Sequence, residues 1–186
     1  MEKFNNFYFH SVRFNLKTLE KILRDGAILS REMAKLELDY DGYNGNKWIS
    51  ICKYYQEEYD CVDYSLDSAY QTLVIDGISL VIDGDINAIK TRYMPYDALY
   101  YPGFSDDSDV RYSCCIDEYQ VKNRISREHF KAMLYPIEKL GMDVNQLKFI
   151  RDLLCKYRYN IPIIDSSSAV IERNLDKLEK KILSKV

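Results

Sequence analysis

The sequence predicts one α+β domain, with a core at about residues 7–165 and a C-terminal helix at about 168–185. Three observations lead to this class. Strand-like and helix-like segments alternate over the first two thirds of the chain, whereas the last third contains two helical patterns. The 186 residues, 47% of them hydrophobic, are enough for one domain with a substantial core. No internal repeat, low-complexity tract or linker divides the chain.

The N-terminal part predicts a strand, a helix and a glycine stop. The segment "FYFHSVR" at 7–13 is rich in aromatic and β-branched residues, as strands are. Asn15 is a favourable helix N-cap and Gly26 a typical helix end. One face of the helix between them carries Leu16, Leu19, Ile22 and Leu23. A short strand or turn, "AILSREM" at 27–33, follows.

The middle of the chain predicts further strands separated by loops. A polar loop at 38–46 precedes "KWISICKYY" at 47–55, which predicts a buried strand. Residues 64–85 fit either a helix followed by a strand or a hairpin, and in both cases "GISLVID" at 77–83 is a strand. The segment 94–110 is rich in proline and aspartate, so it predicts a long loop of the kind that often carries function.

Two adjacent carboxylates, Asp117 and Glu118, stand between the strand-like segments "RYSCCI" and "EYQV". Because neighbouring residues of a strand project to opposite faces, we expect one of them in a cleft and Asp117 to point outward. Ser126 is a helix-start signal, so the segment after it begins either a helix or the next strand.

The C-terminal third predicts two helices and a closing strand. Asp143 and Gln146 form a capping box for a helix, and its expected inward residues are Val144, Leu147, Ile150 and Leu154. Ser168 can cap the final helix. Between the helices, "NIPIID" at 160–165 predicts a strand that Pro162 keeps at the edge of the sheet.

Charge and cysteine content narrow the functional classes. Lysine plus arginine number 26 and aspartate plus glutamate 29, a net charge of −3, so no global positive field indicates a nucleic-acid or membrane partner. The five cysteines form no CxxC pair and there are only two histidines, which argues against a disulfide framework or a zinc site. The sequence shows no signal-peptide or membrane-spanning pattern, so we expect a cytoplasmic protein with reduced thiols.

Few side chains remain that could carry chemistry. The sequence has no glycine-rich phosphate loop, no HExxH and no GxSxG motif. A cysteine–histidine hydrolase that uses Cys52 or Cys114 with His10 stays open, although buried cysteines usually act as small hydrophobic residues. His10 within one strand and Glu118 at the start of another each have a structural explanation alone, as an edge histidine and a solvated carboxylate. Together they are candidate site residues.

Two segments on either side of the middle region share features with one enzyme family. The first, "FYFHSVRFNLKTLEKILRDGAIL", has a histidine in a strand that leads into an "NLxxILxxGxL" type of helix. The second, "DEYQVKNRISREHFKAMLYP", contains a strand of the "NEYxVY" type. Both segments resemble the diphtheria-toxin-like and poly-ADP-ribose-polymerase-like ADP-ribosyltransferases over about residues 7–135. The resemblance implies a split, mostly antiparallel β core with peripheral helices, and NAD as substrate.

The resemblance also implies a catalytic residue and its partners. Glu118 takes the place of the family's catalytic glutamate, which stabilises the positive charge that develops on the ribose as the nicotinamide–ribose bond breaks. His10 and Ser11 would bind the riboses of NAD, and Arg13 belongs to the same NAD-binding segment. His10 and Glu118 would then face one cleft. Ser50 would support the glutamate.

A tyrosine ring is expected to stack on the nicotinamide. The candidates that follow the "WISIC" strand are Tyr54, Tyr55, Tyr64 and Tyr70, and Tyr54 and Tyr64 are preferred. The chain departs from the family's biglutamate pattern, because Gln120 follows Glu118 instead of preceding it. Arginine is therefore the less expected acceptor.

The implied function is NAD-dependent transfer of ADP-ribose to an unknown protein or small-molecule acceptor, with NAD hydrolysis as a further reaction. The tyrosines and aspartates of the loop upstream of Glu118 favour a protein surface over nucleic acid. Small enzymes of this family are often bacterial toxins or effectors, which reach a target cell by routes that the sequence does not show. The alternative is a noncatalytic α+β interaction module that binds a protein through a tyrosine-rich surface, because the chain contains 17 tyrosines.

Overall fold

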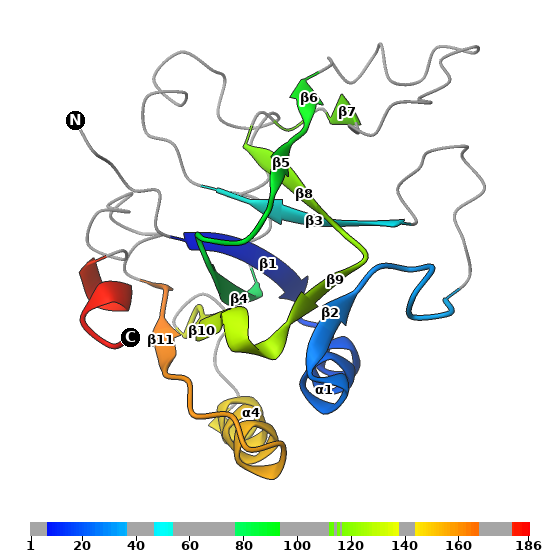
Figure 1. Cartoon of the computed structure of the whole chain (residues 1–186). Coiled ribbons are helices and arrows are strands. Elements are labelled where there is room, and N and C mark those ends of the chain that lie inside the picture. Colours follow the sequence, from blue (N-terminus) through cyan, green and yellow to red (C-terminus); the bar gives the residue numbers. More distant parts are fainter. Residues whose placement is uncertain are drawn as a thin grey trace.

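The computed structural model describes residues 7–36, 47–53, 77–93, 112–113, 115, 117–137, 144–167 and 180–186. These residues form one large, mostly antiparallel sheet, two small strand pairs and the helices α1 (Leu16–Asp25) and α4 (Val144–Lys156) (Figure 1). The predicted α+β class is confirmed. Among the described residues, no helix has the length and apolar character needed to cross a membrane.

The large sheet has seven strands in the order β11-β10-β4-β1-β3-β8-β5. Its members in chain order are β1 (Phe7–Arg13), β3 (Trp48–Cys52), β4 (Ile78–Asp83), β5 (Ile89–Lys90), β8 (Glu118–Lys122), β10 (Phe130–Tyr135) and β11 (Ile163–Asp165). All neighbours pair antiparallel except β10 and β11, which are parallel. Strands β1, β3 and β8 are consecutive in the sheet, so the two segments that carry His10 and Glu118 are separated by β3 alone.

Two small strand pairs form sheets separate from the large one. Strand β2 (Ala27–Leu29) pairs antiparallel with β9 (Arg124–Ser126), and β6 (Arg92–Tyr93) pairs in parallel with β7 (Tyr112–Ser113). In Figure 1, the β6–β7 pair lies at the opposite end of the molecule from α1. The segment after Ser126 makes one 3-10 turn and then enters β10, so it is the next strand and not a helix.

Helix α1 follows the sequence prediction closely. The Asn15 side chain accepts a hydrogen bond from the Thr18 backbone N–H at 3.1 Å, which satisfies one of the free donors of the first turn. Gly26 ends the helix in the left-handed region with φ of 65°. The buried face consists of Leu19, Ile22 and Leu23. The predicted strand, helix and glycine stop are confirmed.

The sheet separates two hydrophobic cores. The larger core includes Tyr8 and Val12 from β1 and packs the sheet against α1 and α4. The smaller core lies on the other face and includes Phe7, Phe9 and Cys52, together with Ile182 near the C-terminus. The alternation of Phe7, Tyr8 and Phe9 between the cores is the period of two expected of a strand buried on both faces.

Strand β1 is bound unequally to its two neighbours. It pairs with β4 along its whole length, from Phe7 opposite Asp83 to Arg13 opposite Ile78. With β3 it pairs only through Phe9 and Cys52. Beyond this bridge, residues of both strands line a pocket, and we call the region between residues 10–13 and 48–51 the β1–β3 opening.

Several expectations need correction. Val144 is 73% exposed, whereas Ile150, Leu153 and Leu154 form the buried face of α4. Asp117 does not point to solvent, because its side chain is fully buried. The loops at 38–46 and 94–110, and residues 64–76, lie outside the described residues. Most of the expected final helix does too, although residues 180–183 are helical.

Candidate functional site

Buried polar groups gather where β8 begins. Among the described residues, the buried charged side chains are Lys53, Asp117 and Glu118. The Lys53 backbone N–H donates to the Asp117 carbonyl at 3.1 Å, which joins the end of β3 to the start of β8. Burial of charged groups is costly, and such groups persist mainly where a function needs them. We call Lys53, Asp117, Glu118 and the groups that contact them the β8 cluster.

Glu118 is held by contacts on both its side chain and its backbone. The residue is 8% exposed, and its Oε2 accepts a hydrogen bond from the Ser113 hydroxyl. The Glu118 carbonyl accepts from the Thr91 N–H at 3.1 Å and from the Thr91 hydroxyl at 2.9 Å. A carboxylate held in one position in this way is suited to stabilise a positive charge that develops beside it.

Cys52 borders this carboxylate but is unsuited to nucleophilic catalysis. Burial raises the pKa of the Cys52 thiol well above its usual range, and the nearby charges of Asp117 and Glu118 raise it further. The thiol donates to the Phe9 carbonyl at a sulfur–oxygen distance of 3.6 Å. A buried thiol that resists ionisation is a poor nucleophile. Cys114, the other candidate of the hydrolase hypothesis, lies outside the described residues.

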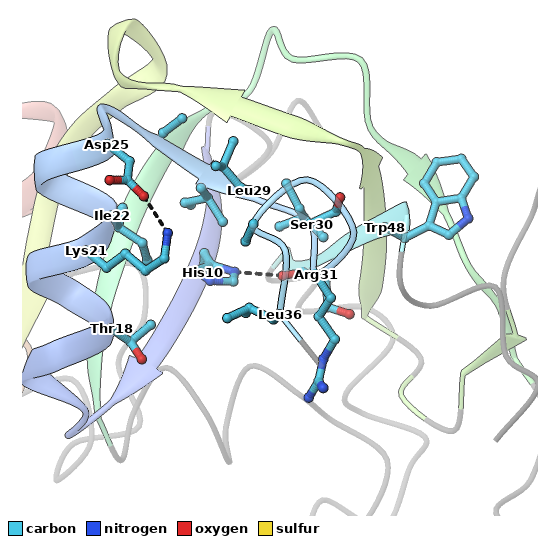
Figure 2. Close-up of a pocket in the computed structure, with 15 residues that line it drawn as sticks. His10, Thr18, Lys21, Ile22, Asp25, Leu29, Ser30, Arg31, Leu36 and Trp48 are labelled. Carbon is cyan, nitrogen blue, oxygen red and sulfur yellow. Dashed lines mark hydrogen bonds and ion pairs between the residues drawn. The ribbon is translucent and has the colours of Figure 1, made fainter. Parts of the chain in front are cut away.

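A pocket of about 210 Å³ lies between α1, β2 and the start of β3 (Figure 2). His10 points into it from β1, with Thr18 and Lys21 of α1 on one side and Leu29 and Ser30 on the other. The Trp48 ring points away from the pocket. Most of the remaining wall is apolar, and the lining residues of this kind are Ile22, Ala27, Ile28, Leu29, Ala34, Leu36 and Ile49. An apolar wall with a few polar groups is typical of a small-molecule site.

The tautomer of His10 follows from its contacts. Its Nδ1 lies 2.9 Å from the Ser50 carbonyl oxygen, which can only accept, so Nδ1 carries the proton. Burial lowers the pKa of the imidazole, and the hydrogen bond to Ser50 opposes this only in part. The ring is therefore neutral near pH 7, and its Nε2 is a hydrogen-bond acceptor. The pocket thus offers an acceptor to a ligand hydroxyl or N–H group.

His10 and Glu118 lie on opposite faces of the sheet. Directly paired residues of antiparallel strands share a face, whereas successive residues of one strand alternate. Phe9 pairs with Cys52 and Cys52 with Glu118, so Glu118 lies on the face of Phe9. His10 follows Phe9 and projects to the other face. The expectation that His10 and Glu118 face one cleft is therefore not met.

Ser11 and Ser50 share the face of Glu118. Each lies two residues from the Phe9–Cys52 bridge, and Ser50 pairs with the buried Gln120. Their side chains border the β1–β3 opening from the side of Glu118, whereas Ser50 also lines the His10 pocket, where its carbonyl contacts His10. The Ser11 hydroxyl accepts from the Arg13 N–H at 3.0 Å.

Three of the predicted site residues remain, Arg13, Tyr54 and Tyr64. Arg13 is exposed at the end of β1 and has φ of 51°, which ends the strand there. Tyr54 and Tyr64 lie outside the described residues, so their expected stacking on nicotinamide stays a prediction. The Glu118 carboxylate accepts a hydrogen bond from the Ser113 hydroxyl, and the expected support of the glutamate by Ser50 stays a prediction.

Sequence reasoning missed Ser113, Thr91 and Lys53. Ser113 and Thr91 lie in or beside strands of two residues, which are too short to produce a periodic signal. Lys53 reads as an ordinary polar strand end, although its ammonium group is buried over the Tyr8 ring at 4.6 Å from the centroid. The one sequence signal for this cluster was the pair Asp117 and Glu118 at the start of a strand, next to an apolar segment.

No protein-family model and no curated protein sequence matches the chain. A solved structure resembles it. The structure is the Thermus sp. 2.9 DarT in complex with NAD+. The alignment covers 90% of this chain and 99% of the DarT chain, with a TM-score of 0.48 and 8% sequence identity.

Proposed function

We propose that this chain binds NAD, breaks its nicotinamide–ribose bond and transfers ADP-ribose to an acceptor. The observation that carries the proposal is the β8 cluster, in which a buried glutamate is held beside the Phe9–Cys52 bridge, at one end of the β1–β3 opening. The resemblance of both sequence blocks to ADP-ribosyltransferases supports the same activity. Each block contributes a strand that borders β3.

The chemistry assigns a role to Glu118. When the bond from ribose C1′ to the nicotinamide nitrogen breaks, its electron pair leaves with nicotinamide and the ribose becomes oxocarbenium-like. A fixed carboxylate stabilises this charge, as in glycoside cleavage. An acceptor nucleophile then forms the new bond to C1′ and loses a proton. With water as the acceptor, the reaction is NAD hydrolysis.

The two sides of the β1–β3 opening suit different parts of NAD. The pocket of about 210 Å³ is below the range of about 300–1,000 Å³ for sites that enclose a whole ligand, so it fits one nucleoside half. His10 Nε2 would accept from a ribose hydroxyl of that half. On the other side, the Ser11 and Ser50 hydroxyls border the path toward Glu118. Arg13 lies at the end of β1, where a cation would attract the pyrophosphate.

The acceptor in this proposal is a protein or a small molecule. A bacterial toxin or effector role rests on the sequence resemblance alone. In this proposal, Tyr54 or Tyr64 stacks on the nicotinamide ring.

The proposal is tested with purified protein and NAD. We expect NAD to raise the melting temperature in a concentration-dependent way and nicotinamide to be released. Glu118→Gln keeps the size of the side chain and one acceptor oxygen but removes the charge, so we expect it to retain NAD binding and lose at least 100-fold in kcat, on the order of one electrostatic stabiliser. Thermal unfolding and nicotinamide chromatography measure the two effects. If the wild type neither binds nor consumes NAD, the interaction-module alternative replaces the enzyme.

A further inference from the structure

We propose that Ser113 is a positioning residue that orients the Glu118 carboxylate for the reaction. This inference rests on the proposed function and names a second residue of the same site. Ser113 is 5% exposed and its hydroxyl contacts Glu118 directly. It would act on the substrate only through that carboxylate.

The hydrogen bonds of the Ser113 hydroxyl give it one orientation. Its oxygen accepts from the Cys115 backbone N–H at 3.0 Å. A hydroxyl has a single proton, and here the carboxylate oxygen Oε2 of Glu118 receives it. Hydrogen bonds to a charged acceptor are roughly twice as strong as neutral ones, so this bond restrains the glutamate side chain. The Ser113 bond thus selects one direction for the Glu118 carboxylate.

Strand pairing places Ser113 against Glu118 although neither residue lies in a long element. Strand β5 pairs with β8 through Ile89 opposite Gln120, and Thr91 then binds the Glu118 carbonyl. The chain continues directly into β6, whose Tyr93 pairs with Ser113 of β7. The backbone of Glu118 and the hydroxyl that holds its carboxylate are therefore tied to the same segment, residues 89–93.

The first test compares steady-state kinetics of the wild type, Ser113→Ala and Ser113→Thr with NAD. If Ser113 orients the carboxylate, Ser113→Ala lowers kcat roughly 10- to 100-fold, as expected for a misplaced catalytic group, and leaves the KM for NAD within about twofold. Ser113→Thr keeps the hydroxyl and restores most of the activity. The control is Ser166→Ala, because the Ser166 hydroxyl is equally buried and has no hydrogen-bond partner in the described structure. An unchanged kcat in Ser113→Ala overturns the inference.

The second test does not depend on activity. Urea unfolding midpoints are measured for Ser113→Ala, Glu118→Ala and the double variant. A direct bond predicts that the double variant loses less stability than the sum of the single losses. Additive losses contradict the contact between Ser113 and Glu118. A wild type without NAD turnover refutes the proposed function, whereas a non-additive cycle in that protein still supports the contact, so the two failures are distinguishable.

Discussion

The imidazole of His10 donates a hydrogen bond from Nδ1 to the Ser50 carbonyl, with 2.9 Å between the two atoms. This bond spans the β1–β3 opening, where the strands have no backbone pairing beyond Phe9 and Cys52. It holds the end of β3 that faces the pocket and leaves Nε2 as the acceptor that the pocket presents. His10 therefore both lines the pocket and makes a side-chain contact between β1 and β3.

His10→Phe should weaken NAD binding without abolishing the reaction. Phenylalanine fills a similar volume but cannot accept a ligand hydroxyl or donate to Ser50. One lost hydrogen bond of about 0.5–1.5 kcal/mol corresponds to a roughly 2- to 13-fold rise in the KM for NAD. A smaller change in kcat is expected, because His10 lies on the face opposite Glu118. Steady-state kinetics measure both values, and a large fall in kcat at unchanged KM would contradict this division of roles.

Ala34→Trp should block the pocket. Ala34 lines the pocket and is partly buried, so a large ring at this position occupies the space that a nucleoside would need. We expect the rise in melting temperature with NAD to disappear, while the melting temperature of the free protein changes little. Glu32→Trp is the matched control, since Glu32 is exposed and is not a lining residue. If Ala34→Trp keeps full NAD stabilisation, NAD binds elsewhere.

Stability should fall below about pH 6.5 because of His10. Its pKa in the folded protein is lowered by burial from the ordinary value of 6.5. Between these two values the unfolded chain binds a proton that the folded protein does not, so the free energy of unfolding rises with pH in this window. Acidification from pH 7 toward pH 5 therefore favours unfolding. Urea titrations at several pH values measure the slope, and His10→Phe should flatten it; an equal slope in both proteins would exclude His10 as the cause.

Gly77→Ala should destabilise the end of β1. A Cβ on Gly77 would lie 2.6 Å from the Arg13 Cα and 3.1 Å from the Arg13 carbonyl carbon and oxygen, and all three are backbone atoms that cannot rotate away. We expect a loss of about 1–3 kcal/mol in the free energy of unfolding, typical of overpacking. Gly26→Asn is the comparison, because asparagine tolerates the left-handed region and a Cβ there would meet only Arg127 Cδ, at 3.6 Å. Chemical denaturation measures the free energy of unfolding of both variants. A larger loss in Gly77→Ala than in Gly26→Asn indicates a backbone clash, whereas equal losses indicate only the cost of replacing a glycine.

Local elements were predictable because each is specified by residues close together in the chain. The helix at 16–25 has its own cap, apolar face and glycine stop, and β1, β3 and β4 are each rich in aromatic or β-branched residues. The prediction that Val144 is buried was wrong, because helical periodicity identifies the apolar face of a helix but not which turns of that face are covered by other elements. The short strands β6 and β7 have no local signal and form only by pairing with each other.

The sequence by itself determined the α+β class, the capped helix α1 and the strands that carry His10 and Glu118. Only the tertiary structure decided which face each side chain takes, because a face depends on the register between strands far apart in the chain. That register separates His10 from Glu118 and puts Ser11 and Ser50 on the face of Glu118. It also brings Ser113 to the Glu118 carboxylate, a contact that depends on the pairing of β5 with β8 and of β6 with β7.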